Sequence, residues 1–433
     1  GFYLSGISWI TNSLTFDENF EVLIPFALIF IPIFLSLFIA LPITFIGPYL
    51  TFNFPSVLFF SGILALSDYL RAQILTGFPW NLWAYSSIWL NEILQIINFI
   101  GLYSYNLVLI TFFTLPVIFF FKISVTKKIL YFILISSVIL SLFIFGNFEI
   151  NKNKKKLEKI NEKIFVKIIS PNFDLEYGLT EQQIKERFKN LIRYSDPDKD
   201  KKTVFIWPEG VFSGYSYEEI FTFKELVSKN FSTKHTIIFG TNVLDPKSGN
   251  FYNSMLVVDN NFKIIQKYNK RKLVPFGEFL PFENFLNKLG FKKITEGHGS
   301  FLRGNKNNNL VIDKINFLPL ICYEVIFTDL VQKSNSDTNL IINISEDGWF
   351  GNSIGPDQHF AKSILRAVES NTFFLRSANK GVSAIIDNKG NIVKRLSRNE
   401  AGSIEFIVPL IKSNKNKNDL IFFILLITYL LIF

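Results

Sequence analysis

Long uncharged runs dominate the first 150 residues. No charged residue occurs from Val22 to Ser67, and since a membrane-spanning helix needs about 20 apolar residues, this stretch has room for two spans. Three further apolar runs cover Ile93–Phe121, Ile129–Phe148 and Leu420–Phe433. We therefore expect a transmembrane helical bundle over residues 1–150 and a C-terminal transmembrane helix over residues 416–433, the latter too short to be a complete span.

The pattern changes at a lysine-rich segment that starts at Lys152. From residue 151 to residue 415, short β-rich runs alternate with amphipathic segments, which is typical of a layered α/β fold in a water-soluble domain. The runs that predict buried strands are Ile164–Ser170, Thr203–Trp207, Thr236–Gly240, Ser254–Asp259, Phe317–Cys322 and Leu340–Ser345.

Two helices are marked by their own sequence signals. Thr180 and Gln183 form a capping box, and the apolar residues that follow fall on one helical face. A second amphipathic helix is expected to start near Asp357 and to place Phe360 and Ile364 inward.

Composition excludes several classes of site. With one cysteine and three scattered histidines, the chain has no intramolecular disulfide and no Cys/His metal cluster, and we expect no metal and no cofactor. The net charge of +9 comes from lysine runs that suit solvent or anionic lipid headgroups, so we expect no nucleic-acid partner. Because the chain starts at Gly1 and its only methionine is Met255, we expect N-terminal spans to be missing.

The orientation of the soluble domain stays open on charge alone. Lys122, Lys127 and Lys128 precede the Ile129–Phe148 run and favour a cytoplasmic loop there, which places the domain outside. Seven lysines from Lys152 to Lys167 follow the same run and favour the reverse.

Reactive side chains gather where predicted strands end. Glu209 follows one strand, Cys322 ends another, and Lys270 lies in a loop rich in ionisable residues between them. Attack on an acyl carbon by a thiolate needs a base for the thiol proton and a cation for the oxyanion. Glu209, Lys270 and Cys322 fit these roles, and a nearby ammonium is also expected to lower the cysteine pKa.

Each of the three residues has a plainer interpretation. Cys322 can be a small buried hydrophobe, Glu209 a surface acid, and Lys270 a solvated lysine. The same set also suits a membrane-tethered amidase that acts on a small soluble amide, and a degenerate domain would make the chain a membrane scaffold or lipid carrier.

The order of the motifs argues against the plainer interpretations of the three residues, whereas product analysis with water and amine acceptors would separate an amidase from an acyltransferase. That order resembles the nitrilase superfamily and, more closely, the bacterial apolipoprotein N-acyltransferases. The motifs that carry the resemblance are Gly6–Trp9, Thr76–Trp80, Trp207–Glu209, Lys270, Leu273–Glu278, Cys322–Glu324, Asp347–Gly351, Ser353–Pro356, Gln358–Phe360, Arg366–Glu369 and Leu375–Asn379.

The resemblance implies an αββα nitrilase-like sandwich on the periplasmic side of the bacterial inner membrane, attached to the helical bundle. It implies transfer of an acyl chain from a phospholipid, typically phosphatidylethanolamine, to the cysteine as a thioester. The chain then passes to the amino group of the diacylglyceryl cysteine of an apolipoprotein. Glu209 is expected as the general base, Lys270 as the oxyanion stabiliser and Cys322 as the nucleophile.

The resemblance also extends to neighbouring residues. Glu278, Tyr323 and Glu324 match supporting residues, with Glu278 as a counter-ion for Lys270 and Glu324 as an acceptor that fixes its loop. Trp80, Trp349 and Tyr177 are candidate lipid contacts.

This chain departs from the family pattern at two positions. Tyr177 lies in a loop where the family usually has tryptophan, and Glu346 stands where asparagine is common. The first departure puts the lipid contact of that loop in doubt. The second replaces a neutral amide by a carboxyl group.

Overall fold

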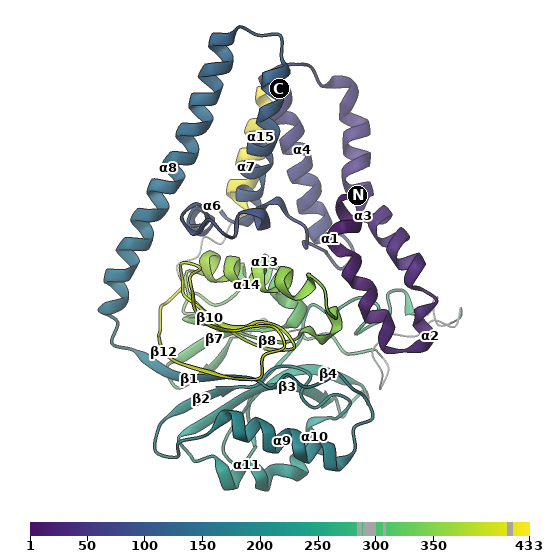
Figure 1. Cartoon of the computed structure of the whole chain (residues 1–433), viewed down its shortest axis with the longest axis vertical. Coiled ribbons are helices and arrows are strands. Elements are labelled where there is room, and N and C mark those ends of the chain that lie inside the picture. The colour runs from purple at the N-terminus through teal and green to yellow at the C-terminus, as the bar shows by residue number, and fades with distance from the viewer. Residues whose placement is uncertain (284–287, 289–299, 306–308, 414–418) are drawn as a thin grey trace.

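The computed structural model describes the chain except residues 284–287, 289–299, 306–308 and 414–418. Long helices occupy one end of the molecule and two stacked sheets the other (Figure 1). Of the C-terminal segment expected from residue 416, residues 416–418 lie outside the described residues.

Three stretches among the described residues are long and apolar enough to cross a membrane: Ile24–Tyr49, Leu102–Phe120 and Val125–Glu158. They contain helices α3 (Ile24–Ile46), α7 (Leu102–Thr114) and α8 (Val125–Glu158). The shorter apolar helix α15 (Leu420–Ile432) ends the chain.

Helix α4 (Phe54–Gln73) is the second helix of the uncharged stretch from Val22 to Ser67, but it is not one of the three candidate spans. It continues past that stretch and buries Asp68 and Arg71, which form a 2.8 Å ion pair. It packs against α3, α7 and α15, so it forms the centre of the helical part.

Shorter helices connect and cover these elements. Before α3 come α1 (Phe2–Ile7), η1 (Ser8–Phe16) and α2 (Glu18–Glu21). The others in the helical part are η2 (Gly47–Tyr49), η3 (Trp83–Ser87), α5 (Asn91–Leu94), α6 (Ile97–Ile100) and η4 (Leu115–Phe120).

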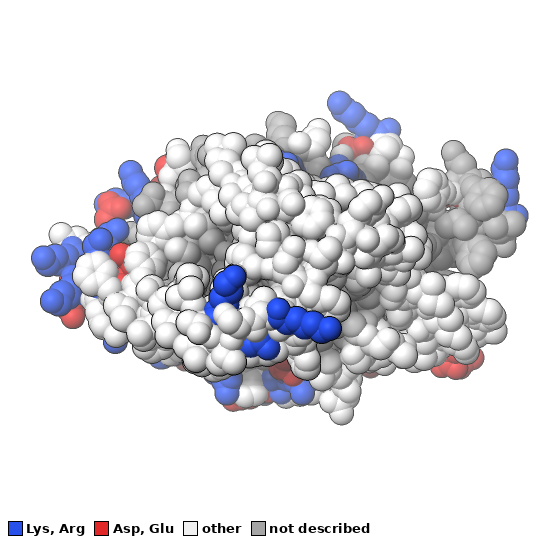
Figure 2. Space-filling view, turned by 90° about the horizontal axis from the view of Figure 1, so that it is seen from above, with Lys and Arg blue, Asp and Glu red and all other residues white. Residues whose placement is uncertain are grey.

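Helix α8 joins the two parts of the molecule and lies apart from the other long helices over much of its length (Figure 1). It runs without a break across residue 150, where the composition changes, and ends at Glu158. Seen from the end opposite the sheets, the surface is mostly uncharged, with a few basic side chains (Figure 2).

Two six-stranded sheets form the other part. The first has the order β12 (Gly402–Pro409), β1 (Lys163–Ser170), β2 (Thr203–Ile206), β3 (His235–Leu244), β4 (Phe251–Val258) and β5 (Ile264–Asn269). The second has the order β11 (Ile392–Leu396), β10 (Ser383–Ile386), β9 (Phe373–Asn379), β8 (Leu340–Glu346), β7 (Ile315–Ile321) and β6 (Leu310–Ile312).

All six predicted strands are confirmed, with small shifts at their ends. In both sheets three central strands are parallel, β1–β2–β3 and β7–β8–β9. Strands β2 and β7 stop one residue earlier than predicted, so Trp207 and Cys322 both begin the segments that follow their strands. The reactive residues therefore lie at strand ends, where open α/β sheets form their sites.

Helices cover the outer face of each sheet, which gives the expected αββα order of layers (Figure 1). The first sheet is covered by α9 (Glu181–Ser195), α10 (Tyr217–Ile220), η5 (Phe221–Phe223) and α11 (Lys224–Asn230). The second is covered by η7 (Cys322–Ile326), α13 (Thr328–Gln332), η8 (Asp347–Phe350) and α14 (Gly355–Ser370).

Both predicted helices are confirmed. The capping box of α9 is present, with Thr180 and Gln183 bonded to each other's backbone. In α14, Phe360 and Ile364 are buried as expected. This helix belongs to the same hydrophobic core as the helical part, so it joins the sheet part of the molecule to the helical part.

Candidate active site

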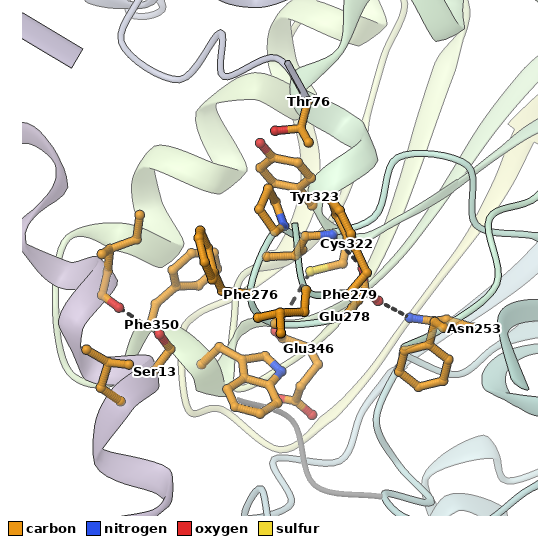
Figure 3. A pocket seen from close by; sticks show the side chains of 18 of the residues that line it. Ser13, Thr76, Asn253, Phe276, Glu278, Phe279, Cys322, Tyr323, Glu346 and Phe350 are labelled. Atoms are coloured by element: carbon orange, nitrogen blue, oxygen red, sulfur yellow. Dashed lines mark hydrogen bonds between the residues drawn. The ribbon is translucent and has the colours of Figure 1, made fainter. Parts of the chain in front are cut away.

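A cavity of about 1120 Å³ extends from the sheet ends to the helical part. Its polar end contains Glu209, Asn253, Lys270, Glu278, Cys322 and Glu346, and Figure 3 shows the labelled members of this set around one space. One face of α3 forms an apolar wall through Phe26, Ala27, Phe30, Ile31, Phe34 and Leu35. The sequence-predicted catalytic residues are thus brought together beside a surface suited to a hydrocarbon chain.

Lys270 holds the centre of the polar end. Its Nζ lies 2.9 Å from Glu278 Oε1 and 3.7 Å from Glu209 Oε1. Asn253 Nδ2 donates to both carboxylates, at 2.7 Å each. The second oxygen of Glu278 accepts from the backbone of Val274 at 2.8 Å. The ammonium is therefore fixed between two oriented carboxylates.

Cys322 begins η7 in a left-handed backbone conformation, with φ of +47°. A non-glycine residue in this region is strained and is held there by its surroundings. The thiol is partly exposed, and its Sγ lies 4.0 Å from the carbonyl oxygen of Glu346. The turn thus presents the sulfur to the cavity.

A buried ionic cluster lies behind the nucleophile. His359 Nε2 is 3.2 Å from the Cys322 carbonyl oxygen, and its Nδ1 is 2.9 Å from Asp347 Oδ1. Arg376 binds the other oxygen of Asp347 at 2.7 Å. These contacts support the backbone of Cys322 through its carbonyl group.

Tyr323 and Glu324 hold the same turn. Tyr323 donates its hydroxyl to the Gly77 carbonyl at 3.1 Å, which links the turn to the Thr76–Trp80 loop. Glu324 accepts from the Tyr268 hydroxyl and from the backbone N–H of Arg271, Lys272 and Ile321. One carboxylate thereby joins the Lys270 loop to the end of strand β7, directly before Cys322.

Burial changes the pKa values of the candidate catalytic residues. It raises the pKa of Glu209 above its ordinary value, although Lys270 opposes the change. Burial alone would lower the pKa of Lys270, but Glu278 and Glu209 more than offset it, so the pKa lies above its ordinary value and the side chain stays an ammonium.

The expected lowering of the Cys322 pKa is wrong. Burial and the Glu209 carboxylate raise the pKa of the thiol, and the opposing effect of Lys270 is smaller. Cys322 therefore rests as a thiol, and a base is needed if it is to act as a nucleophile.

The three candidate lipid contacts all line the cavity. Tyr177 and Trp349 lie near each other, with ring centroids 6.2 Å apart. Trp80 is almost fully buried, donates to Gln358 Oε1 at 2.7 Å and stacks on His359. Trp80 therefore also supports the cluster behind Cys322.

Asn253 was missed at the sequence level. It lies within β4, one residue before the buried Ser254. The available signal was a pair of polar residues inside a run of otherwise apolar strand residues, since buried polar groups need partners. That signal does not identify the partners, which are Glu209 and Glu278.

Comparisons with known proteins cover both parts of the chain. The carbon-nitrogen hydrolase family matches residues 180–412, more than half of the 433 residues. The apolipoprotein N-acyltransferase N-terminal domain matches residues 1–115. Among solved structures, Saccharomyces cerevisiae Nit3 of the nitrilase superfamily aligns with a TM-score of 0.42 and 17% identity, over 58% of this chain and 91% of Nit3.

Relatives match this chain over nearly its whole length. The apolipoprotein N-acyltransferase of Rhodopseudomonas palustris is 29% identical over 425 residues, which cover 94% of this chain and 78% of the relative. That of Rickettsia typhi is 33% identical over 419 residues, which cover 94% and 81%. Together with the three candidate spans, these matches make the chain a membrane protein. It belongs to the apolipoprotein N-acyltransferase family, with the nitrilase-type fold in its catalytic part.

Proposed function

We propose that this protein transfers an acyl chain from a phospholipid, through a thioester on Cys322, to the N-terminal amino group of the diacylglyceryl cysteine of apolipoproteins. One observation carries the proposal: Glu209, Lys270 and Cys322 meet in the cavity whose wall is an apolar face of α3. A small soluble amide has no use for such a wall, whereas an acyl chain does.

In the first half-reaction, Glu209 takes the thiol proton as Cys322 Sγ attacks the ester carbonyl carbon of the donor. The oxyanion that forms is stabilised by the ammonium of Lys270. The carbon–oxygen bond of the ester then breaks, and the lysophospholipid leaves with the proton from Glu209. A thioester on Cys322 remains.

In the second half-reaction, the neutral α-amine of the lipoprotein cysteine attacks the thioester carbon. Glu209 accepts a proton from the attacking nitrogen and returns it to the sulfur as the carbon–sulfur bond breaks. An amide and free Cys322 result, so donor and acceptor react in turn at one site with ping-pong kinetics.

The finer details of substrate and location are part of the proposal. Phosphatidylethanolamine is the proposed donor, and the bacterial inner membrane the proposed location, with residues 151–415 as a periplasmic catalytic domain. The positions of Lys122, Lys127 and Lys128 support this orientation, because they lie around the start of α8, at the end opposite the sheets. Residues 1–150 and 416–433 form the membrane part.

The test is mass spectrometry of the Cys322 peptide after the detergent-purified protein meets phosphatidylethanolamine, with Cys322→Ala as the control. We expect an acyl adduct on Cys322 that hydroxylamine removes and that an amine acceptor discharges faster than water does. An unmodified Cys322 in folded protein would overturn the proposal, and faster discharge to water would favour an amidase.

A further inference from the structure

Glu346 touches both the base and the nucleophile through its backbone. Its N–H donates to Glu209 Oε2 at 3.1 Å, and its carbonyl oxygen lies 4.0 Å from Cys322 Sγ. Strand β8 ends at this residue, and η8 starts at the next. Any shift of the Glu346 backbone therefore changes the geometry of both reacting groups.

The side chain of Glu346 determines where this backbone lies. Oε1 accepts from the Gly348 N–H at 2.8 Å, and Oε2 accepts from Asn379 Nδ2 at 2.8 Å. Asn379 in turn bonds both the N–H and the carbonyl of Phe173, at 2.8 Å each. The carboxyl group thus joins the end of β8 to the segment that carries Tyr177 into the cavity.

Both partners of the carboxyl group are donors. The Asn379 amide cannot turn over without losing both bonds to Phe173, so it keeps its N–H directed at Glu346. An ionised carboxylate accepts from two donors at full strength, whereas a protonated one has a single strong acceptor oxygen. The hydrogen-bond pattern therefore fits the ionised form.

The surrounding charges oppose that form. Glu209 and Asp347 face Glu346 with negative charge, and Cys322 beside it is a neutral thiol. Asp347 is already paired with Arg376 and His359. Arg187 of α9 is a positive charge that favours an ionised Glu346, but it acts from a distance. It already pairs with Glu176 and donates hydrogen bonds to the carbonyl groups of Val211 and Asp174.

As a result, burial raises the pKa of Glu346 to about 8, against its hydrogen bonds to Asn379 and Gly348. The carboxyl group is neutral below this pH and ionised above it. Its hydrogen bonds to Asn379 and Gly348 are therefore strongest at a pH above this value.

We propose that Glu346 is a positioning residue whose ionised carboxylate holds the Glu209 and Cys322 geometry and the Phe173–Tyr177 segment for acyl transfer. The inference rests on the proposed function and deepens it. It makes part of the rate depend on a carboxyl group that does not itself touch the substrate.

The experiment compares wild type with E346Q by the rate of Cys322 thioester formation at pH values on either side of 8. A glutamine directs one N–H group at a donor and breaks the link to Asn379 or Gly348. At alkaline pH we expect E346Q to be slower by roughly 10- to 100-fold, the cost of misplacing reacting groups. At acidic pH the difference shrinks to a few-fold, because the wild-type carboxyl is neutral there too.

E346D and E181Q complete the design. E346D keeps an ionisable group, so its rate of thioester formation is expected to recover part of the increase that wild type shows at alkaline pH. It also serves as a second variant should E346Q fail to fold. E181Q removes an exposed carboxylate at the start of α9 and keeps the full pH response of wild type.

The outcomes separate the inference from the function on which it rests. A constant slowing of E346Q at every pH would mean a purely structural role, and an unchanged profile would mean none; either result overturns the inference. Absence of the thioester in wild type at every pH would overturn the proposed function itself.

Discussion

The two ends of the cavity are built on different principles. At the polar end, four side chains come from three separate segments: Glu209 follows β2, Asn253 lies in β4, and Lys270 and Glu278 lie in the loop after β5. The polar atoms of each interacting pair lie within 3.7 Å of each other. At the apolar end, one helix contributes a continuous strip of the wall, because the α3 residues that line the cavity recur at helical spacing.

The difference has consequences for mutation. A polar group that loses its partner in a buried site leaves another group unsatisfied, so single changes at the polar end should cost much of the rate. The wall offers only shape and hydrophobicity, which neighbouring side chains can partly replace. Mutations at the polar end should therefore lower the rate strongly, whereas mutations at the apolar wall should have smaller effects.

Glu209→Gln should have the largest effect of the variants that keep the nucleophile. Because the Cys322 pKa lies above its ordinary value, little thiolate forms without the base, and we expect a loss of roughly 10²- to 10⁴-fold in thioester formation. Wild-type activity should fall on the acid side at a pH above 4.5, the ordinary value, because the folded pKa of Glu209 is raised and the base is protonated below it. A Glu209→Gln protein with wild-type rates would contradict the assigned role.

Lys270→Met should come next. The change removes the positive charge that faces the oxyanion and leaves Glu209 and Glu278 without their shared cation. We expect a loss of roughly 10²- to 10³-fold in the rate of thioester formation, the usual cost of one oxyanion donor. Lys267→Met, at an exposed position of the strand β5 that precedes Lys270, is the matched control and should keep the wild-type rate. Equal losses in both variants would contradict a specific role for Lys270.

Asn253→Ala tests the hydrogen bonds that position the carboxylates of Glu209 and Glu278. Without its amide, Glu209 and Glu278 each lose a 2.7 Å hydrogen bond. A hydrogen bond to a charged group contributes about 1.5 kcal/mol or more, so we expect roughly a tenfold slower first half-reaction. Asn242→Ala is the control, because Asn242 pairs with Asn253 across the β3–β4 ladder and also lines the cavity. The thioester rate should fall in the first variant and stay near wild type in the second.

Local signals explain how much of the fold could be predicted. Both partners of the α9 capping box lie within one turn, and each of the six predicted strands has an apolar run of its own, so these elements need no knowledge of distant residues. Helix α4 is harder, because its Asp68–Arg71 pair looks like the end of a span in the sequence but is buried among other helices.

The candidate site shows the same limit. Glu209, Lys270 and Cys322 stand out by their place at strand ends and by the order of their motifs. The direction of the Cys322 pKa could not be predicted, because it depends on burial by both sheets and on the position of Glu209. Asn253 could not be assigned either, since its two acceptors come from other parts of the chain.

The smallest effect is expected at the apolar wall. Ala27 is the small residue of the α3 face that lines the cavity, so Ala27→Phe should fill space beside the acyl chain and leave the polar end unchanged. We expect long-chain donors to form the thioester more slowly. A tight hydrophobic pocket discriminates by roughly tenfold or more per methylene group, and we expect a smaller factor here because the side chains of the wall can move. Shorter donors should be affected less.

Ile29→Phe is the control for the wall, because Ile29 is an exposed residue of the same helix and does not line the cavity. It should leave the chain-length profile of the Cys322 thioester unchanged, as read by mass spectrometry with a mixture of donors. If Ala27→Phe slows all chain lengths by one factor, the helix face acts on the polar end rather than on the acyl chain. A shift confined to long chains would instead place the chain along α3 and separate the two ends of the cavity by function.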